Sequence, residues 1–515
     1  MAYIAYSTPK ANGAIYATVV ESYRKGGKIG QNRIENLGCV VDQEKGIFKN
    51  RERGIFCYTL ESGATEVSLE DMDSLGTGAL PTQFKQERLI LDFGDSYILD
   101  RYIRNLPIHE AINEILPNER DTLLSLLFYR ILTEKRANCY ASTWLGGNYA
   151  CLLFPEARLT SQRISEFLVR LGEENVQRIF FERYLEILYG RQNGQTAAIL
   201  IDSSGLPNAS KMSVTQLNNH NGDISLEARL IYVIDRQNGM PIYFRYCPGN
   251  IVDVSTLCTT IAELSQYNVN VDSAIVDAGY FSEPNVKELY ENGIHFVTRL
   301  APNRVIFKDV VEEHLHDIIS AKYAIRYGGR LVYMKKVEVD VYGKEGYAYA
   351  GVDMDSRNSR VKKATFTCMD DKLAPEETDK RISKLGVFIL LSSDDIDTKD
   401  ILPLYYTRPQ VEQVFDIAKN NADILPLRTQ NEDTFRGHLM LTFLATVILQ
   451  KMQRDILTLR KKGDKTNPEG TLMTLRNQKC KVYDANIVPQ EAVKDINAVY
   501  KLLGIKCPTT IARAI

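Results

Sequence analysis

The chain has 515 residues and a formal net charge of −2, with 44% hydrophobic and 25% charged residues. These proportions are ordinary for a globular protein, and a chain of this length should form about three or four domains of about 150 residues each. The near-zero charge excludes a uniformly basic surface, so a nucleic-acid partner would need local basic segments. The nine cysteines contain no Cys-x2-Cys pair, which argues against a zinc knuckle or a redox motif.

Basic residues cluster in three short segments. They are Arg24, Lys25, Lys28 and Arg33; Lys49, Arg51 and Arg53; and Lys451, Arg454, Arg460, Lys461 and Lys462. Each segment could contact phosphates, and each could equally be ordinary solvated surface. The start of the sequence lacks a signal-peptide pattern, and the longest apolar run, 439–449, is too short to span a bilayer. We therefore expect a cytoplasmic protein, with a buried helix over 439–449.

The first third of the chain shows two kinds of pattern. Residues 14–38 are rich in β-branched and aromatic residues around a Lys-Gly-Gly-Lys turn, which predicts a β-hairpin. From 96 to 187 the apolar spacing becomes helical, with helices predicted at 121–132 and 161–171. These two helices would suit either a helix-turn-helix DNA reader or simple packing, and the sequence leaves both open.

From residue 196 the apolar runs become short, which is typical of buried strands. The predicted order is β-β-β-α-β-α-β: strands at 197–202, 226–234 and 242–246, a helix at 253–267, a strand at 273–277, a helix at 283–291 and a strand at 294–299. Residues 301–386 interrupt this pattern with two hairpins and a polar helical stretch, so we interpret them as an insertion. A strand at 387–391 and helices within 403–420 and 438–455 follow.

Near the C-terminal end, a phenol, two cations and an acid stand in a fixed spacing: Tyr405, Arg408, Glu412 and Lys419. Pro409 is typical of the first position of a helix, so we predict that a helix begins near Arg408. Arg408, Glu412 and Lys419 then fall within roughly 40° of one another at about 100° per residue. A carboxylate between two cations can hold a metal ion next to a phosphate, although a surface salt-bridge helix has the same pattern.

Two further carboxylates, Asp202 and Asp277, are predicted at strand ends. In a mixed sheet with this order of elements the two ends can be neighbours, and the helix carrying Glu412 can bring a third acid to them. Such acids repel each other unless cations neutralise them. Hard oxygen ligands suit Mg²⁺, and two ions about 4 Å apart can activate a nucleophile and stabilise a leaving oxygen. Taken singly, each aspartate could instead form a turn or cap a helix.

Together these motifs resemble the DDE transposases of bacterial insertion sequences, in the group with the Tyr-Arg-Glu-Lys signature. The matching segments are Ile201-Asp202, Asp277-Ala-Gly-Tyr-Phe281, Tyr405/Arg408/Glu412/Lys419, Pro248-Gly-Asn250 with Asp253 and Thr256, Arg436-Gly-His438, and Glu21-Ser-Tyr-Arg24 with Leu37-Gly38. The resemblance covers most of the chain and is strongest between 196 and 445.

The resemblance implies an α/β fold with a ribonuclease-H-like mixed-sheet catalytic core. It implies two Mg²⁺ ions per active site, with Mn²⁺ as a substitute. The catalytic metal ligands would be Asp202, Asp277 and Glu412, and the DNA phosphate contacts Tyr405, Arg408 and Lys419. The expected regions are an N-terminal β-hairpin and mixed region with DNA contacts (1–100), a helical region that binds DNA ends (101–190), a first core segment (191–300), a β-rich insertion (301–386), a second core segment (387–455) and a helical C-terminal tail that could serve dimerisation (456–515).

The implied activity is cut-and-paste transposition through a DNA hairpin. The partners would be the terminal inverted repeats and target DNA, with a homodimer in the synaptic complex, no membrane partner, and association with the nucleoid. Related enzymes hold a flipped base in an aromatic pocket, often with tryptophan, but the only tryptophan here is Trp144. The candidate substitutes are Tyr280, Phe281, Tyr405 and Tyr406. A structure-selective nuclease and a transposase-derived DNA-binding protein remain alternatives.

Overall fold

The computed structural model describes residues 2–8, 14–25, 28–50, 53–65, 67, 89–133, 136–190, 196–208, 210, 212–220, 223–251, 253–427, 429–461 and 463–512. The predicted turn at 26–27 and the basic residues Arg51 and Lys462 lie outside the described residues, as do the side chains of Lys25 and Lys28. The chain divides into two compact units. The N-terminal unit comprises Met1–Leu89, Lys481–Val488 and Thr510–Ile515, and the core unit comprises Ile90–Cys480 and Pro489–Thr509.

The N-terminal unit is built on a six-stranded antiparallel sheet. Its strands follow chain order: β1 (Ala2–Tyr6), β2 (Tyr16–Lys25), β3 (Lys28–Asp42), β4 (Ile47–Asn50), β5 (Gly54–Thr59) and β6 (Gly63–Thr65). β2 and β3 pair antiparallel, which confirms the hairpin predicted at 14–38. Apolar side chains at alternate positions of these strands, among them Val19, Phe48 and Phe56, form a small buried core.

The first part of the core unit, up to Tyr189, is mainly helical. They are α2 (Gly94–Ile103), α3 (Ile108–Glu114), α4 (Arg120–Leu132), α5 (Ala141–Gly147), α6 (Ala150–Leu153), α7 (Ser161–Leu171) and α8 (Glu174–Tyr189). α4 is buried along its length from Thr122 on, so it is a packing helix and has no face to offer to DNA. α7 packs on α16 (Glu432–Leu459), and a side chain at Gly437 would collide with the backbone oxygen of Leu168. Glycine therefore allows this close helix crossing.

A mixed sheet lies at the centre of the core unit. Its strands include β8 (Thr196–Pro207), β9 (Gln216–His220), β10 (Asp223–Asp235), β11 (Met240–Pro248), β12 (Asn270–Val276), β13 (His295–Arg299) and β17 (Val387–Ser392). They lie in the order β11-β10-β8-β12-β13-β17, with β9 beside β10, and β8, β12 and β13 run parallel. With α9 (Leu257–Gln266) and α10 (Glu283–Glu291), they confirm the predicted order of elements apart from the additional strand β9. The mixed α/β fold is thus confirmed.

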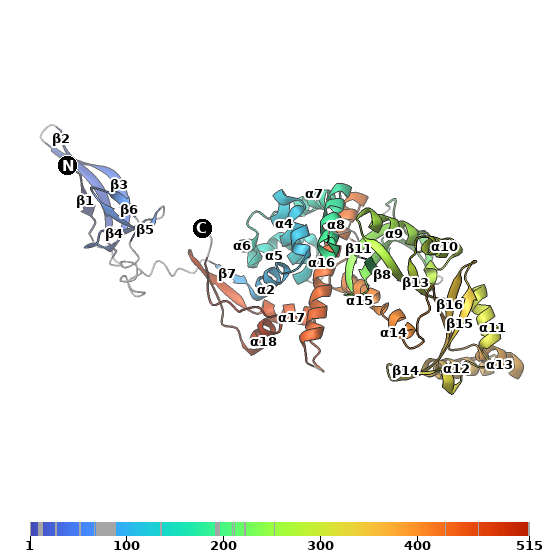
Figure 1. Ribbon diagram of the computed structural model, residues 1–515. Helices are drawn as coiled ribbons and strands as arrows, with labels where there is room; N and C mark the ends of the chain where they lie inside the picture. Colours follow the sequence, from blue (N-terminus) through green and yellow to red (C-terminus); the bar gives the residue numbers. More distant parts are fainter. Residues whose placement is uncertain are drawn as a thin grey trace. The chain divides into compact units, whose positions relative to one another are not determined.

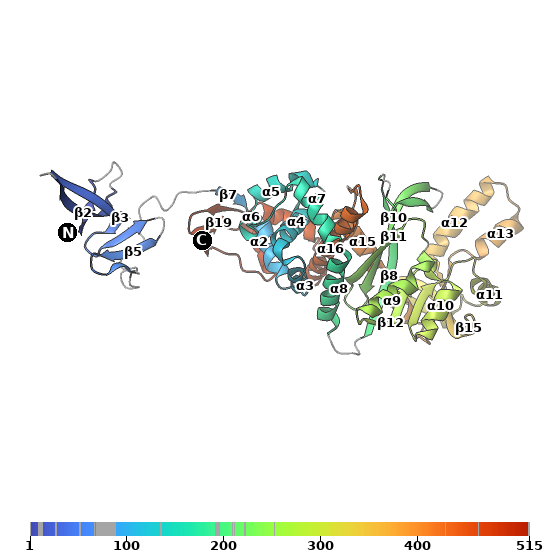
Figure 2. The ribbon, with the colours of Figure 1, turned by 90° about the horizontal axis from the view of Figure 1, so that it is seen from above.

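The segment predicted as an insertion contributes helices as well as strands. It holds α11 (Val305–His314), β14 (Ala324–Tyr327), β15 (Arg330–Asp340), β16 (Glu345–Asp353), α12 (Met354–Asp370) and α13 (Pro375–Ser383). Its strands form antiparallel hairpins, and β16 also pairs with β17. The insertion therefore extends the central sheet, with α12 and α13 at its far end in both views (Figure 1, Figure 2).

Helices cover both faces of the central sheet (Figure 1). α9 packs on β12 and α10 on β13, whereas α15 (Pro409–Asn420) packs on β8 and β10 and α16 packs on β11. Residues 439–449 lie within α16 and are all buried, as predicted. Among the described residues, no helix combines the length and apolar character needed to cross a membrane. The remaining elements are β7 (Leu89–Asp92), α14 (Ile401–Tyr405), α17 (Pro468–Arg476), β18 (Lys479–Val482), β19 (Asn486–Pro489), α18 (Lys494–Leu502) and β20 (Ile511–Ala512).

Candidate functional site

Two of the predicted acids lie on adjacent parallel strands at the same edge of the sheet. β8 pairs with β12 only as far as Leu200, and β12 ends at Val276, so Asp202 and Asp277 both stand just beyond the parallel pairing. The prediction that Asp202 ends its strand is wrong. β8 continues to Pro207 because the long strand β10 keeps pairing with it. The two carboxylates therefore lie close together just beyond the point where the pairing of β8 with β12 ends.

The third acid comes from the start of α15. This helix begins at Pro409, with Arg408 as its N-cap residue and Glu412 in its first turn, so the predicted helix start is confirmed. α14 ends at Tyr405, only a few residues earlier. Because α15 packs on β8 and β10, its first turn is brought to the strand that carries Asp202.

The guanidinium of Arg408 links all three carboxylates. Its Nη2 donates to Asp202 Oδ2 at 2.9 Å and lies 3.2 Å from Asp277 Oδ2, while its Nη1 lies 3.5 Å from Glu412 Oε1. Asp202 also accepts the backbone N–H of Ser203 through Oδ1 at 2.9 Å. The Glu412 side chain is 62% exposed, against 16% for Asp202. The three acids are thus gathered around one cation, with Glu412 held most loosely.

Arg408 remains charged in this setting. Burial disfavours a charged guanidinium, but the carboxylates of Asp202 and Asp277 outweigh that effect and raise the pKa of Arg408 above its usual value. Among the described residues, the ion pairs of this cluster join one positive charge, that of Arg408, to three carboxylates. These four groups together keep a negative excess, which attracts further cations. The Nε of Arg408 is buried and has no hydrogen-bond partner in the part of the chain that the structure describes. The guanidinium is therefore incompletely satisfied where it lies.

Lys419 lies on the same helix but has a different partner. Its Nζ donates to Ser204 Oγ at 2.6 Å, and within the described ranges no ion pair joins it to the three acids. Ser204 and Asp202 are two residues apart on β8, so both project from the face that α15 covers. Lys419 is therefore a second cation beside the acid cluster rather than a member of it.

The two adjacent tyrosines of the motif have different surroundings. Tyr405 is 6% exposed, and burial raises its pKa to about 12. Tyr406 is 37% exposed, and its ring stacks on Tyr327 from the insertion with centroids 5.3 Å apart. The guanidinium of Arg330 lies 5.9 Å from both ring centroids. Two other aromatic candidates are buried: Tyr280 and Phe281.

The donor set of the acid cluster determines whether it fits a divalent metal. Among the described residues, no group of three or more His, Cys, Asp and Glu side chains is arranged to hold a metal ion as it stands. The donor type nevertheless fits Mg²⁺ or Mn²⁺, which prefer carboxylate oxygens. Asp202, Asp277 and Glu412 already surround a cation, the Arg408 guanidinium. Its charged nitrogens stand in for the positive charge that a metal would supply.

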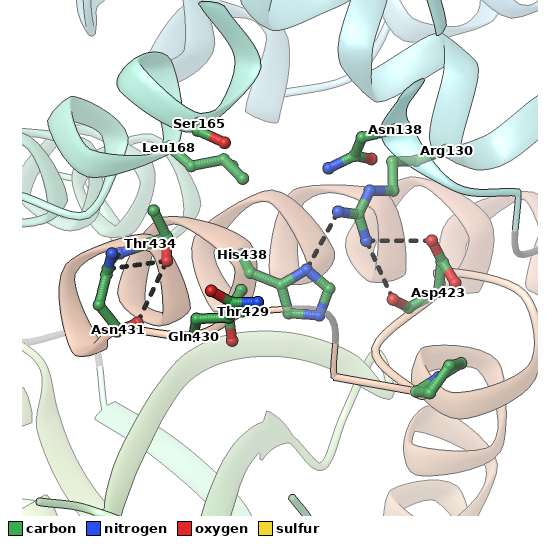
Figure 3. Close-up of a pocket in the computed structure, with 11 residues that line it drawn as sticks. Arg130, Asn138, Ser165, Leu168, Asp423, Thr429, Gln430, Asn431, Thr434 and His438 are labelled. Carbon is green, nitrogen blue, oxygen red and sulfur yellow. Dashed lines mark hydrogen bonds and ion pairs between the residues drawn. The ribbon is translucent and has the colours of Figure 1, made fainter. Parts of the chain in front are cut away.

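A separate polar cavity of about 340 Å³ lies beside the loop between α15 and α16 (Figure 3). Arg130, Asp423 and His438 line it, and each is at most 5% exposed. Arg130 donates to the backbone oxygen of Asp423 at 2.9 Å and to Nδ1 of His438 at 3.0 Å. Because arginine can only donate, His438 accepts through Nδ1 and donates from Nε2 to the backbone oxygen of Ile424 at 3.1 Å. This network ties the loop after α15 to α4 and α16.

Three residues that contact the Tyr-Arg-Glu-Lys motif were not predicted from the sequence: Ser204, Tyr327 and Arg330. Ser204 stands two positions after Asp202, and the alternation of side chains along β8 would have placed both on one face. Tyr327 and Arg330 come from the hairpin of β14 and β15. No sequence signal points to them, because the contact with Tyr406 depends on how the insertion folds back against α14.

Comparison with known proteins finds one family model that matches the central region of the chain. Residues 194–448 match the family model described as the transposase DDE domain, which supports a DDE transposase, an enzyme of DNA phosphoryl transfer. Enzymes of this class generally use divalent metal ions. No curated protein matches the chain. Among solved structures, the chain is similar to piggyBac transposase in a synaptic complex with hairpin DNA, with a TM-score of 0.41, 12% identity, and coverage of 74% of this chain and 79% of that chain.

Proposed function

We propose that this protein is a transposase that binds the ends of a DNA element and catalyses their metal-dependent cleavage and strand transfer. The observation that carries the proposal is the convergence of Asp202, Asp277 and Glu412 on Arg408, inside the segment that matches the transposase DDE domain. The position of the acids at the edge of a mixed sheet is consistent with a ribonuclease-H-like core. The Tyr-Arg-Glu-Lys spacing favours an origin in a bacterial insertion sequence.

The three acids would hold divalent cations, with Mg²⁺ as the natural ion, two ions per active site, and Mn²⁺ as a substitute. When bound, such ions would neutralise the scissile phosphate and favour ionisation of the attacking hydroxyl group. Asp202 and Asp277 would form the fixed side of the site, because the sheet positions their backbones. Glu412 would complete it from α15, where its exposed side chain is free to turn toward a ligand.

The cations of the motif would bind DNA phosphates around the cut. Lys419 is held beside the acids by Ser204, and a positive charge there suits a phosphate next to the scissile bond. The planar guanidinium of Arg408 suits bidentate contact with a phosphate. A tyrosine ordinarily keeps its proton at neutral pH, and burial raises the pKa of Tyr405 further, to about 12. Its role would therefore be that of a hydrogen-bond donor.

The cut-and-paste route would pass through a DNA hairpin, which requires a place for an unpaired base. Tyr406 is the one exposed residue among the four aromatic candidates named from the sequence. It stacks on Tyr327, and Arg330 lies near both rings. Aromatic rings and guanidinium planes are the surfaces on which unstacked bases rest. This group of three side chains supports a hairpin intermediate.

The partners would be double-stranded DNA, namely the terminal inverted repeats of the element and a target duplex. A homodimer would hold two ends together in the synaptic complex. Inverted repeats that flank the coding region would supply the substrate for the test. The helical region of the core unit (101–190) is the expected site of end binding, and the N-terminal region (1–100) is expected to contact DNA.

The test measures Mg²⁺-dependent cleavage of the element ends by two variants. In each variant an amide replaces one carboxylate of α15. Glu412→Gln should abolish cleavage and leave end binding largely intact, because it removes one proposed metal ligand. Asp416→Asn is the matched control, since Asp416 lies one turn later on the same helix and its carboxylate binds Asn420. Normal cleavage by Glu412→Gln would overturn the assignment of the site.

A second assay separates a transposase from a structure-selective nuclease on the same fold. Pre-cut element ends with a free 3′-OH are mixed with a supercoiled target in the presence of Mg²⁺. A transposase joins these ends to the target, whereas a nuclease only shortens or nicks the DNA. Cleavage without any joined product would support the nuclease.

A further inference from the structure

We propose that Arg408 is an internal counter-ion of the acid cluster that moves to a DNA phosphate when DNA binds, so that metal ions and DNA bind cooperatively. The inference rests on the proposed function, because it assumes that the three acids hold metal. It identifies Arg408 as the residue that links metal binding to DNA binding. It also predicts that the site binds metal ions weakly until DNA is bound.

The contacts of Arg408 make it a direct competitor of a metal ion. Its Nη2 lies 2.9 Å from Asp202 Oδ2 and 3.2 Å from Asp277 Oδ2. Asp202 and Asp277 are also the residues that would hold a metal ion under the proposed function, so their carboxylates would serve either cation. A metal ion and the guanidinium therefore cannot occupy the space between the two aspartates together, and their positive charges repel each other at such a distance.

The arginine is also poorly satisfied in this position. It donates to the carboxylates through its terminal nitrogens, but its buried Nε has no hydrogen-bond partner among the described residues. A buried N–H without a partner carries a desolvation cost. A phosphate offers several acceptor oxygens in the geometry that a guanidinium fork prefers. Binding of DNA therefore provides a better set of acceptors than the cluster does.

The change requires only a turn of one side chain. The backbone of Arg408 is fixed as the N-cap of α15, and its N–H donates to the backbone oxygen of Tyr405 at 3.1 Å. The Arg408 side chain is 20% exposed and that of Asp277 is 40% exposed, so the guanidinium lies at the mouth of the cluster. It can leave toward solvent without unfolding any element.

The two equilibria are then linked. If a phosphate draws Arg408 out, the acids regain their full negative charge and bind a divalent ion more tightly. Thermodynamic reciprocity requires that the metal ion also tightens DNA binding by the same factor, and couplings of this kind commonly span about 5- to 150-fold. The consequence is a site that assembles its metal ions on DNA rather than free in solution.

Lys419 provides a matched control on the same helix. It carries the same charge as Arg408, but it binds Ser204 Oγ and makes no ion pair with the three acids within the described chain. Removing either residue deletes one positive charge near the cluster. Only the removal of Arg408 also vacates the space between Asp202 and Asp277.

The experiment measures Mn²⁺ binding by the full-length protein without DNA, with free Mn²⁺ followed by electron paramagnetic resonance. The variants are Arg408→Met, Lys419→Met and Asp277→Asn. Arg408→Met should bind Mn²⁺ about 5- to 150-fold more tightly than the unchanged protein. Lys419→Met should differ little, and Asp277→Asn should lose the binding. Arg408→Gln repeats the test with a polar side chain, and circular dichroism confirms that each variant is folded.

A second arm adds a short DNA duplex of arbitrary sequence at low salt and counts only the Mn²⁺ binding that Asp277→Asn abolishes. The duplex should tighten that binding in the unchanged protein and leave Arg408→Met nearly unaffected. The inference would be overturned if, in the first arm, Arg408→Met and the unchanged protein bound Mn²⁺ with equal affinity. It would also be overturned if Lys419→Met tightened Mn²⁺ binding as much as Arg408→Met does. If neither arm shows Mn²⁺ binding that depends on Asp277, the proposed metal site itself fails, which is a distinct result.

Discussion

Arg130 and Arg408 both bind carboxylates within the core unit, but their surroundings differ in charge balance and in access to solvent. Among the described residues, Arg130 pairs with one carboxylate, that of Asp423, and contacts the ring of His438, and all three residues are nearly inaccessible (Figure 3). Arg408 meets three carboxylates, and its side chain and that of Glu412 are partly open to solvent. The first group is balanced and closed, whereas the second carries an excess of negative charge and is open.

Of these two arrangements, the first is typical of a structural ion pair and the second of an active site. A buried pair with matched charges is costly to break, because removal of one partner leaves the other uncompensated in a medium of low polarity. An open cluster with an excess of one sign attracts ligands of the opposite sign and is typical of active sites. The two clusters therefore make opposite predictions for stability and for activity.

The largest expected effect is on activity at the open cluster. Asp202→Asn removes a charge that the sheet holds in place, and it should slow Mg²⁺-dependent cleavage of element ends by about 10³-fold, a loss typical of removing one essential electrostatic contact. Its thermal unfolding temperature should change little. The same substitution at the closed cluster, Asp423→Asn, should lower the unfolding temperature and leave the cleavage rate per folded molecule close to normal. Equal losses of cleavage in the two variants would show that the open and the closed cluster do not differ in their importance for activity.

For the free energy of unfolding, we expect a larger loss from replacing Arg130 in the closed cluster than from replacing Arg408 in the open one. Arg130→Met leaves the Asp423 carboxylate buried without its cation, and the free energy of unfolding should fall by about 3–5 kcal/mol. Urea unfolding followed by circular dichroism measures this change. Arg408→Met should cost less, because the side chains of Asp277 and Glu412 are 40% and 62% exposed and water can compensate them. A larger loss of unfolding free energy in Arg408→Met than in Arg130→Met would indicate that the Arg408 cluster mainly stabilises the fold.

Much of the fold could be predicted because local patterns determine it. Short apolar runs predicted the central strands, and the buried run at 439–449 predicted a section of α16. Pro409 predicted the start of α15, because proline fits the first helical position. The extension of β8 to Pro207 was missed, since it depends on pairing with β10 and not on the apolar run itself.

The sequence predicted that Arg408 and Glu412 lie close together, but it did not predict most other contacts of the candidate site. The spacing of Arg408 and Glu412 gives a contact along one helical face, whereas the contacts of Arg408 with Asp202 and Asp277 depend on how α15 docks on the sheet. The stacking of Tyr406 on Tyr327 depends likewise on the fold of the insertion. Tertiary contacts between distant segments leave no periodic signal in the sequence.

A smaller effect is expected where the insertion reaches the motif. Tyr406→Ala removes a stacking surface, and base–aromatic stacking contributes about 1–3 kcal/mol per base, so the yield of hairpin ends should fall by about tenfold. The first nick should proceed at its normal rate, because Tyr406 makes no contact with the acids in the described structure. Tyr406→Phe keeps the ring and should restore hairpin formation. Loss of the first nick in Tyr406→Ala would instead indicate disturbance of Arg408 nearby.

The smallest expected effect concerns the second cation. Ser204→Ala removes the hydroxyl that accepts the Lys419 ammonium at 2.6 Å, and the loss of about 1 kcal/mol should weaken binding to DNA ends by about fivefold. Lys419 still carries its charge in this variant, so the dependence of binding on salt should keep its slope, whereas Lys419→Met should reduce that slope by about one phosphate contact.

Two controls decide whether Ser204 acts through Lys419. Ser204→Thr keeps a hydroxyl and should restore binding. Ser203→Ala makes the same change one residue earlier, on the opposite face of β8 where Ser203 accepts from Arg229, and should leave end binding nearly unchanged. If Ser204→Ala weakened the binding of Lys419→Met just as much as that of the unchanged protein, Ser204 would contact DNA by itself. An effect that disappears in the Lys419→Met background instead identifies Ser204 as the residue that positions Lys419 beside the acids.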